Sequence, residues 1–300
     1  MITRPPTTSN PRNIAVIGAG YVGIPTAVTL AVIGHRVVLA ERDASRLAML
    51  QAGRSPIHEP GLEPLLQECL RDGSLVCVES AVTAVADAHV TFLCVPTPQD
   101  DDGSADLSYV VSTAHEISDA LQPGSIVVNK STVPVGTAQL VERTLGRSDI
   151  AVVSNPEFLR EGTAVADSFH PDRVVVGSHD VAKGREVSDL FASTGAAVVL
   201  TTTATAETIK YASNAFLAVK LSFINAMAGF CESVGADVRD LVVGLGFDPR
   251  IGRHYLNVGP GWGGSCLPKD TAALLHMSES NGFDFELLRG AINTNESQLQ

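Results

Sequence analysis

The chain has 300 residues, of which 45% are hydrophobic and 18% charged, and its formal net charge is −12 at pH 7. These values are typical of a soluble globular protein with one large or two ordinary domains, and the negative charge disfavours nucleic acid as a partner because phosphate binding requires a basic surface. The five cysteines form no C-x-x-C pair and are odd in number, which favours a reducing compartment over a disulfide framework.

The first twelve residues are polar and rich in Pro and Thr, which predicts a disordered N-terminus without a signal sequence. No segment reaches the roughly eighteen uninterrupted apolar residues of a membrane span. We therefore expect a cytoplasmic protein that has no membrane partner.

The next stretch has the pattern of a dinucleotide site. An apolar strand pattern at residues 13–18 leads into Gly18-x-Gly20-x-x-Gly23, a helical pattern follows at 22–33, and a second strand pattern ends in Glu41. In such a unit the glycines make the tight turn and admit the pyrophosphate, while the acid binds the ribose hydroxyls. We interpret it as an NAD site, because an acid at this place disfavours the 2′-phosphate of NADP.

Strand and helix patterns then alternate along the chain. Further strands are predicted at residues 75–78, 90–95, 125–129, 150–154, 174–177 and 197–200, and helices at 61–71, 107–121, 137–145 and 181–193. Continuous apolar strands alternating with helices indicate an α/β fold with a Rossmann-like, doubly wound parallel sheet. Ligands bind beyond the carboxyl ends of such strands, so we expect the loops at 95–98, 130–134 and 154–162 to line the site.

From residue 204 the composition changes to one long helical pattern without proline, which ends near Val234. About thirty residues is long for a globular helix, and we expect it to be the spine of a helical central domain that forms a homodimer. Lys210 and Asn214 share one face of this helix, but the spacing leaves a functional and a solvent-exposed Lys210 equally open. The predicted segments are a disordered N-terminus at 1–12, an NAD-binding domain at 13–203 and the central domain at 204–300, which also contains helices at 238–245, 270–281 and from 284 onward.

The densest cluster of reactive residue types is Gly259-Pro-Gly-Trp-Gly-Gly-Ser-Cys-Leu-Pro-Lys-Asp270. Its glycines and prolines predict a stiff turn in which backbone approaches a ligand closely. Cys266 has Lys269 and a helix start at Pro268 nearby, and both favour a thiolate. We predict that Cys266 is a nucleophile and that the other four cysteines are small buried core residues; these are Cys69, Cys77, Cys94 and Cys231. The acidic run Asp100-Asp-Asp-Gly103 lacks the ligand spacing of a metal site.

The chain resembles the UDP-glucose/GDP-mannose dehydrogenase family from about residue 13 to its last residues. The resemblance rests on the Gly18–Gly23 fingerprint, Lys130-Ser-Thr-Val-Pro-Val-Gly136, Asn155-Pro-Glu-Phe-Leu-Arg-Glu-Gly162, His170-Pro-Asp-Arg-Val-Val-Val-Gly177 and Gly263-Gly-Ser-Cys-Leu-Pro-Lys-Asp270. It implies a four-electron, NAD-dependent oxidation of a nucleotide sugar, with UDP-glucose favoured as substrate, in polysaccharide biosynthesis. The family normally has a further C-terminal domain that closes over the nucleotide. We expect this domain to be missing here, either because the sequence is truncated or because the natural protein lacks it, and in both cases UDP binding should be weak.

The resemblance also implies roles for individual residues. The implied catalytic residues are Cys266, Lys210, Asn214, Asp270, Glu157 and Thr132, and Cys266 would capture an aldehyde as a thiohemiacetal that is oxidised to a thioester. The residues implied near NAD are Gly18, Gly20, Tyr21, Val22, Gly23, Glu41, Arg46, Thr97, Thr132, Glu161 and Lys269. Those implied for the substrate are Glu157, Phe158, Leu159, Arg160, Lys210, Asn214, Arg250, Tyr255 and Gly263, with Arg250 offered across a subunit interface.

Two other functions stay open at this point. A β-hydroxyacid-type dehydrogenase would use Lys210 for a two-electron oxidation and would not need a thiol. A non-catalytic NAD-binding or dimerisation module would bind NAD without turning over a nucleotide sugar. The number of NADH molecules formed per sugar and the effect of replacing Cys266 separate these functions.

Overall fold

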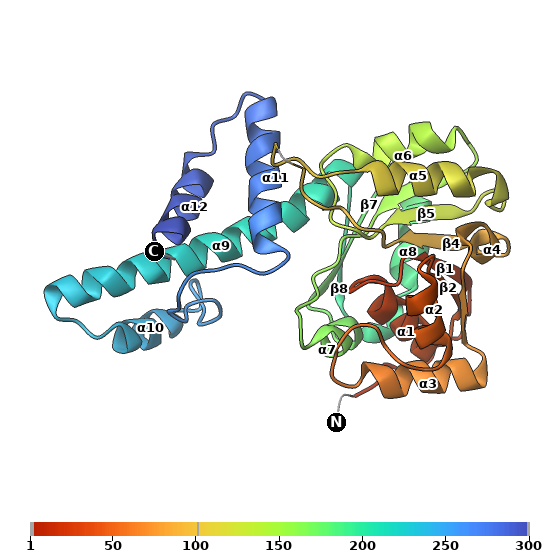
Figure 1. Cartoon of the computed structure of the whole chain (residues 1–300), viewed down its shortest axis with the longest axis horizontal. Coiled ribbons are helices and arrows are strands. Elements are labelled where there is room, and N and C mark those ends of the chain that lie inside the picture. Colours follow the sequence, from red (N-terminus) through yellow and green to blue (C-terminus); the bar gives the residue numbers. More distant parts are fainter. Residues whose placement is uncertain (1–2, 101, 299–300) are drawn as a thin grey trace. The chain divides into compact units, whose positions relative to one another are not determined.

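The computed structural model describes residues 3–100 and 102–298 (Figure 1), and the chain divides into two compact units. Unit 1 comprises residues 1–97 and 107–210, and unit 2 comprises residues 98–106 and 211–300. The sequence placed the domain boundary between residues 203 and 204. The unit boundary falls after Lys210, inside one continuous helix, α9 (Thr203–Val234).

Unit 1 is built on an eight-stranded sheet of order β3-β2-β1-β4-β5-β6-β7-β8. The strands are β1 (Asn13–Ile17), β2 (Arg36–Ala40), β3 (Leu75–Val78), β4 (Val90–Leu93), β5 (Ile126–Asn129), β6 (Ala151–Ser154), β7 (Arg173–Ser178) and β8 (Ala197–Thr201). Neighbouring strands run parallel except β6 and β7, which are antiparallel. The predicted Rossmann-like sheet is confirmed. The expectation that all its strands are parallel is wrong for β6 and β7, because the connection through the short α7 (Ala164–Phe169) brings the chain back in the opposite direction.

Helices cover both faces of this sheet (Figure 1). One core contains side chains from α1 (Gly23–Ile33), α2 (Ala44–Gln51), α3 (Leu62–Asp72), α7 and α8 (Val181–Asp189). The other contains side chains from α4 (Ala81–Val85), α5 (Ser108–Ile117) and α6 (Thr137–Leu145). Along β1, Ile14 and Val16 belong to the first core while Ala15 and Ile17 belong to the second, as the period of two residues in a strand requires.

Three helices of unit 1 were not predicted from the sequence. They are α2, α4 and α7, which have 8, 5 and 6 residues and are too short to show a helical period clearly. Asp43 and Ser80 accept a backbone hydrogen bond at the starts of α2 and α4, so their capping residues were a usable signal. The predicted helices at 107–121 and 181–193 end as short 3₁₀ turns, η1 (Ser118–Ala120) and η2 (Ala192–Thr194).

Residues 3–12, which precede β1, have no regular secondary structure but make several contacts with the rest of unit 1. The backbone amide of Thr8 donates to Ile33 O at 2.7 Å, and Arg4 forms an ion pair with Glu68 at 2.7 Å. The sequence predicted disorder for residues 1–12; residues 3–12 instead make these contacts, and residues 1 and 2 lie outside the described residues.

Unit 2 contains the rest of α9 together with α10 (Val238–Gly246), α11 (Leu267–Ser280) and α12 (Glu286–Gln298). This confirms the predicted helical central domain with a long spine helix. The glycine-rich turn before α11 is anchored by Trp262, which is buried and whose Nε1 donates to Ser222 Oγ at 2.9 Å. The side-chain amide of Asn295 accepts from Trp262 N and donates to Trp262 O, so the turn is held to α9 and α12.

By length and composition α9 is apolar enough to cross a membrane, and 39% of its most apolar window is buried. Its polar side chains Glu207, Lys210 and Asn225 are nonetheless buried and hydrogen-bonded to other parts of the fold. Because buried charges need such partners, we describe α9 as a core helix that is shared by the two units.

Candidate active site

The turn between β1 and α1 has the shape that a bound dinucleotide requires. Gly18 has a left-handed backbone (φ +97), and a Cβ there would lie 2.6 Å from Cys94 O; a Cβ at Gly23 would lie 1.8 Å from Gly18 O. A Cβ at Gly20 would meet no atom within 4 Å. The first and third glycines are therefore demanded by the fold, whereas the second leaves open space where a pyrophosphate can approach the backbone at the start of α1.

Glu41 follows β2 and is held beside this turn. Its Oε2 accepts from Ala19 N at 3.2 Å and its Oε1 accepts from Asp43 N at 2.9 Å. Arg46 lies on the same side, where its Nη2 donates to Ala19 O at 2.5 Å and its Nε is 3.8 Å from Glu41 Oε2. The geometry therefore fits the ribose-binding role expected of Glu41 and brings Arg46 to the same turn.

Other residues expected near NAD are brought together at the loops that follow β4 and β5. The Thr97 hydroxyl donates to Thr132 O at 2.9 Å. The hydroxyl of Tyr21 accepts from Gly162 N at 3.0 Å, which links the fingerprint turn to the loop that carries Glu161. The sequence had not singled out Glu59, a buried residue whose carboxylate accepts from Gly162 N and from Ala164 N at the start of α7.

Lys210 and Glu157 form a buried ion pair in unit 1. The two residues are 4% and 8% exposed, and Lys210 Nζ lies 2.8 Å from Glu157 Oε1. Glu157 Oε2 accepts from Leu159 N at 2.6 Å, and the Lys210 ammonium lies 5.5 Å from the centroid of the Phe158 ring. Lys210 is thus a buried, oriented cation, and of the two alternatives left by its helical spacing the solvent-exposed one is excluded.

A second buried lysine, Lys130, follows β5 directly. Its Nζ donates to Asn155 Oδ1 at 3.1 Å and lies 5.3 Å from the centroid of the Phe191 ring. Burial lowers the pKa of Lys130 below its usual value, because the charged form loses its hydration. In the sequence Lys130 and Asn155 are only parts of two separate motifs, and their joint burial is visible only in the folded sheet.

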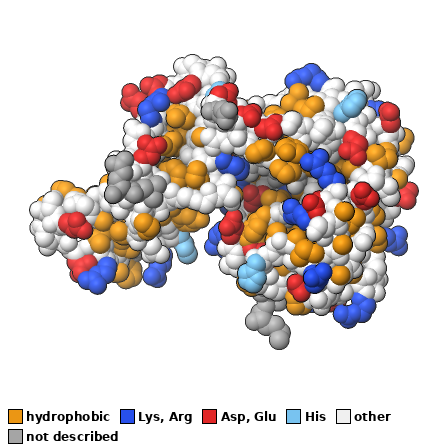
Figure 2. All heavy atoms as spheres, in the orientation of Figure 1, with side chains coloured by type: hydrophobic (Ala, Val, Ile, Leu, Met, Phe, Trp, Pro, Cys, Tyr) orange, Lys and Arg blue, Asp and Glu red, His pale blue; other side chains and the backbone are white. Residues whose placement is uncertain are grey.

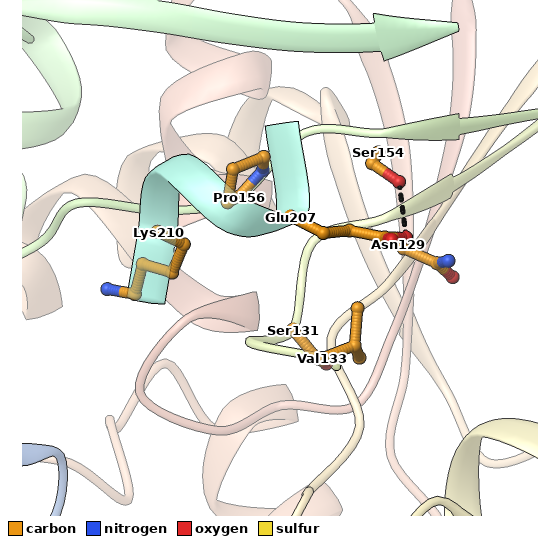
Figure 3. A pocket seen from close by; sticks show the side chains of 7 residues that line it. All are labelled: Asn129, Ser131, Val133, Ser154, Pro156, Glu207 and Lys210. Atoms are coloured by element: carbon orange, nitrogen blue, oxygen red, sulfur yellow. Dashed lines mark hydrogen bonds between the residues drawn. The ribbon is translucent and has the colours of Figure 1, made fainter. Parts of the chain in front are cut away.

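A small pocket beside Lys210 is large enough for about one water molecule (Figure 3). It is lined by Asn129, Ser131, Val133, Ser154, Pro156, Glu207 and Lys210. The side-chain amide of Asn129 is buried and makes no hydrogen bond to the rest of the described chain. The polar lining therefore suits a water molecule.

In unit 2, Cys266 is exposed and is the residue immediately before α11. The helix N-terminus next to it favours negative charge. Asp270, in the first turn of α11, accepts from Lys269 Nζ and from Asn214 Nδ2, each at 2.5 Å. The structure thus brings Asn214, Lys269 and Asp270 together. The Lys269 ammonium is bonded to Asp270, and the feature next to the Cys266 thiol that favours a thiolate is therefore the start of α11.

The prediction that Cys266 differs from the other cysteines in burial is confirmed. Cys69, Cys77, Cys94 and Cys231 are buried. Burial raises the pKa of Cys77 to about 11 and that of Cys94 to about 12. These two stay protonated thiols, which makes them poor nucleophiles.

The remaining residues expected to contact substrate lie in loops, where Phe158, Leu159 and Tyr255 are half-buried and the others are exposed. Arg250 has a side chain that is 88% exposed and forms an ion pair with Asp248 at 2.6 Å, and Gly263 is exposed. Arg160 is exposed and paired with Asp167. Within the described chain, Tyr255 is the one non-glycine residue with a left-handed backbone (φ 61), a conformation that is uncommon for a bulky side chain.

Comparison with known sequences decides the family. Residues 12–194 match the profile of the UDP-glucose/GDP-mannose dehydrogenase family, NAD binding domain, and residues 204–297 match that of the central domain of the same family. The chain belongs to this family. The recognition of the family and the prediction of an NAD-binding domain are therefore confirmed, while the roles of individual residues stay predictions.

The similarity to curated relatives covers nearly all of this chain. It is 46% identical over 298 residues to a UDP-glucose 6-dehydrogenase of Pseudomonas aeruginosa and 45% identical over 291 residues to the UDP-glucose 6-dehydrogenase YwqF of Bacillus subtilis. The alignments cover 96% and 95% of this chain and 66% of each relative. The chain thus spans just under two thirds of the length of these relatives.

Solved structures of the same family have the same fold as this chain. A UDP-glucose dehydrogenase from Pyrobaculum islandicum has a TM-score of 0.94 and 42% identity, covering 97% of this chain and 69% of its own. A GDP-mannose dehydrogenase from Pseudomonas aeruginosa has a TM-score of 0.76 and 33% identity, over 95% and 69%. A 3-hydroxyisobutyrate dehydrogenase of Mycobacterium tuberculosis, at 18% identity and a TM-score of 0.70 over 95% and 92%, shares the fold alone.

Proposed function

We propose that this protein oxidises a nucleotide sugar in two NAD-dependent rounds, converting UDP-glucose to UDP-glucuronate. The relatives with 46% and 45% identity are named UDP-glucose 6-dehydrogenases. The observation that carries the proposal is the state of Cys266: of the five cysteines, all within the described residues, it alone is exposed, and it directly precedes a helix. Such a thiol can hold the aldehyde and acyl intermediates of a four-electron oxidation, whereas a two-electron oxidation has no such intermediates to hold.

The first round removes a hydride from C6 of the sugar and a proton from its hydroxyl group, which yields an aldehyde. NAD, bound at the Gly18–Gly23 turn, supplies the hydride acceptor in both rounds. Lys210 stabilises the negative oxygen as it develops, and Glu157 keeps the Lys210 ammonium oriented through the 2.8 Å ion pair. Thr132 positions a water molecule.

The second round runs through Cys266. Its sulfur adds to the aldehyde carbon, and the oxygen takes up a proton, which gives a thiohemiacetal. Loss of a hydride from that carbon and of the hydroxyl proton gives a thioester. Water then adds to the thioester carbon, the carbon–sulfur bond breaks, and the carboxylate and the free thiol are released. Asn214 and Asp270, joined by a hydrogen bond, position the substrate and activate this water.

The same proposal assigns the nucleotide sugar to six residues that lie in loops. Phe158, Leu159, Arg160, Arg250, Tyr255 and Gly263 bind it, and Glu161 and Lys269 contribute to the NAD site. The exposed Arg250 guanidinium suits contact with a ligand held by a second subunit. A reaction that consumes NAD and a nucleotide sugar also favours a cytoplasmic location.

A homodimer built along α9 forms part of the proposal. Phe216, Phe223 and Phe230 are spaced by seven residues and are 64%, 50% and 56% exposed, so they form an apolar stripe on one face of the helix. Val243 and Phe247 of the neighbouring segment are exposed as well, and Figure 2 shows hydrophobic side chains on the surface of this part of unit 2. Contiguous apolar surface of this kind is typical of an interface.

The proposal is tested by measuring NADH release with a panel of UDP- and GDP-sugars, on this chain and on a longer form that includes any further domain. We expect two NADH per UDP-glucose, and we expect Cys266→Ala and Cys266→Ser to abolish formation of the carboxylate. One NADH per sugar with an aldehyde or ketone product, unaffected by Cys266→Ala, would instead support the β-hydroxyacid-type function. NAD binding without turnover of any sugar would support a non-catalytic module.

A further inference from the structure

Glu207, in the second turn of α9, is a buried carboxylate that the mechanism above does not use. It is 3% exposed. Its Oε2 accepts from Gly136 N at 2.8 Å, and its Oε1 accepts from Ala138 N at 3.0 Å and from Ser154 Oγ at 2.9 Å. Both oxygens therefore accept from backbone amides, which is the pattern of an ionised carboxylate. Figure 3 shows its side chain reaching from α9 towards Ser154.

The three partners of Glu207 belong to the segments that carry the site residues of unit 1. Gly136 closes the loop that contains Thr132, and Ser154 ends β6 immediately before the loop that contains Glu157. Glu207 itself lies one helical turn before Lys210 on α9. One carboxylate thus ties together the segments that bear Thr132, Glu157 and Lys210.

This link is unusual for a helix cap. The helices α2, α4 and α8 are capped by their own N-cap residues Asp43, Ser80 and Asp180. At α6 the N-cap is Gly136, which has no side chain, and the capping carboxylate comes from 71 residues further along the chain. A local cap would satisfy the α6 amides at less cost, because burial raises the pKa of Glu207 and the hydrogen bonds offset only part of that effect. The buried charge is therefore better explained by its tertiary connections than by capping alone.

We propose that Glu207 is a positioning residue of the active site, which sets the relative placement of the Thr132 loop, the Glu157 loop and Lys210 through its three hydrogen bonds. It does not touch the reacting atoms. The expected effect of Glu207 on turnover rests on the proposed function. The inference that Glu207 holds the two loops and Lys210 in place does not depend on that function. Small displacements of such residues reduce turnover strongly, since a shift of about 1 Å can cost on the order of 100-fold in rate.

Three variants separate positioning from stability. Glu207→Gln keeps the size of the side chain but turns one accepting atom into a donor that faces another donor. Ser154→Ala breaks only the link to β6 and leaves the α6 amides capped, so it remains informative if Glu207→Gln does not fold. Asp180→Ala is the matched control, because it removes an N-cap from α8 in the same unit without contacting the site segments.

The kinetic test uses UDP-glucose and the form of the protein, this chain or a longer one, that oxidises it. We expect Glu207→Gln to lower kcat by about tenfold or more and Ser154→Ala by a smaller factor, with KM for NAD within about twofold of wild type. Asp180→Ala should lower the melting temperature without changing kcat. Wild-type kcat in Glu207→Gln, or an equal loss of kcat in Asp180→Ala at the same loss of melting temperature, would overturn the proposal.

Amide hydrogen exchange tests the geometric part on this chain without any turnover. We expect faster exchange in peptides covering 130–138 and 154–160 in Glu207→Gln, in 154–160 alone in Ser154→Ala, and in neither in Asp180→Ala. Unchanged exchange in Glu207→Gln would refute the positioning role. Wild-type enzyme that oxidises no nucleotide sugar would instead refute the proposed function, and the exchange result would still decide whether Glu207 orders these loops.

Discussion

The open space at Gly20 gives a sharp test of the NAD site. In Gly20→Ala the added methyl group meets no protein atom within 4 Å, and Gly20 does not have a left-handed backbone. The fold should therefore accept the substitution. The methyl group would occupy the space through which the pyrophosphate approaches the backbone, so the loss should fall on binding.

The substitution Gly20→Ala should therefore change NADH binding much more than it changes stability. A methyl group forced into a close-packed contact costs about 1–3 kcal/mol, which corresponds to a dissociation constant for NADH raised roughly 5- to 150-fold. The free energy of unfolding should stay unchanged or rise by up to about 1 kcal/mol, because alanine restricts the unfolded chain more than glycine does.

The assay combines calorimetric titration of NADH with denaturant unfolding for three matched variants. Gly18→Ala should lose stability, since its Cβ would lie 2.6 Å from Cys94 O in a left-handed backbone, which by itself costs about 1–2 kcal/mol. Gly229→Ala, at a helical site in unit 2 that is also open within 4 Å, should bind NADH as wild type does. Wild-type NADH affinity in Gly20→Ala, or a loss of stability equal to that of Gly18→Ala, would refute the reasoning.

Three further predictions concern stability and assembly. Lys210→Met leaves the Glu157 carboxylate buried without its cation and should lower the unfolding free energy by about 3–5 kcal/mol; denaturant titration should show part of this restored when Glu157→Gln is added, and strict additivity would contradict the pairing. Phe223→Asp should shift the mass measured by light scattering from dimer to monomer at micromolar concentration, and a wild-type protein that is already monomeric would rule out the α9 interface. Burial lowers the pKa of His35 below 6.5, so the stability from its neutral form is full above pH 6.5 and is lost as pH falls through the lower folded pKa. Unfolding measured between pH 7.5 and about 5 should show this loss in wild type and in the control His115→Gln, but not in His35→Gln.

Local sequence patterns predicted most of the fold and the central residues of the candidate site. The apolar strands, the fingerprint at residues 18–23 and the glycine-rich turn before Cys266 are each complete within a short stretch of sequence. Glycine spacing, a strand period and a capping residue act over a few bonds, so the Rossmann-like sheet, the NAD site and the spine helix were predictable. The antiparallel β6–β7 pair was not, because strand direction depends on the path of the connecting loop.

Only the tertiary structure decided how the buried charges are paired. The sequence left the burial of Lys210 open, and the fold joins it to Glu157, 53 residues away. Lys130 and Glu207 likewise obtain partners from distant segments, Lys130 from Asn155 and Glu207 from the amides of Gly136 and Ala138. A charge can be buried only where partners replace its hydration. The sequence by itself thus determined which elements and reactive groups this protein has, and the packing of those elements determined which groups face one another.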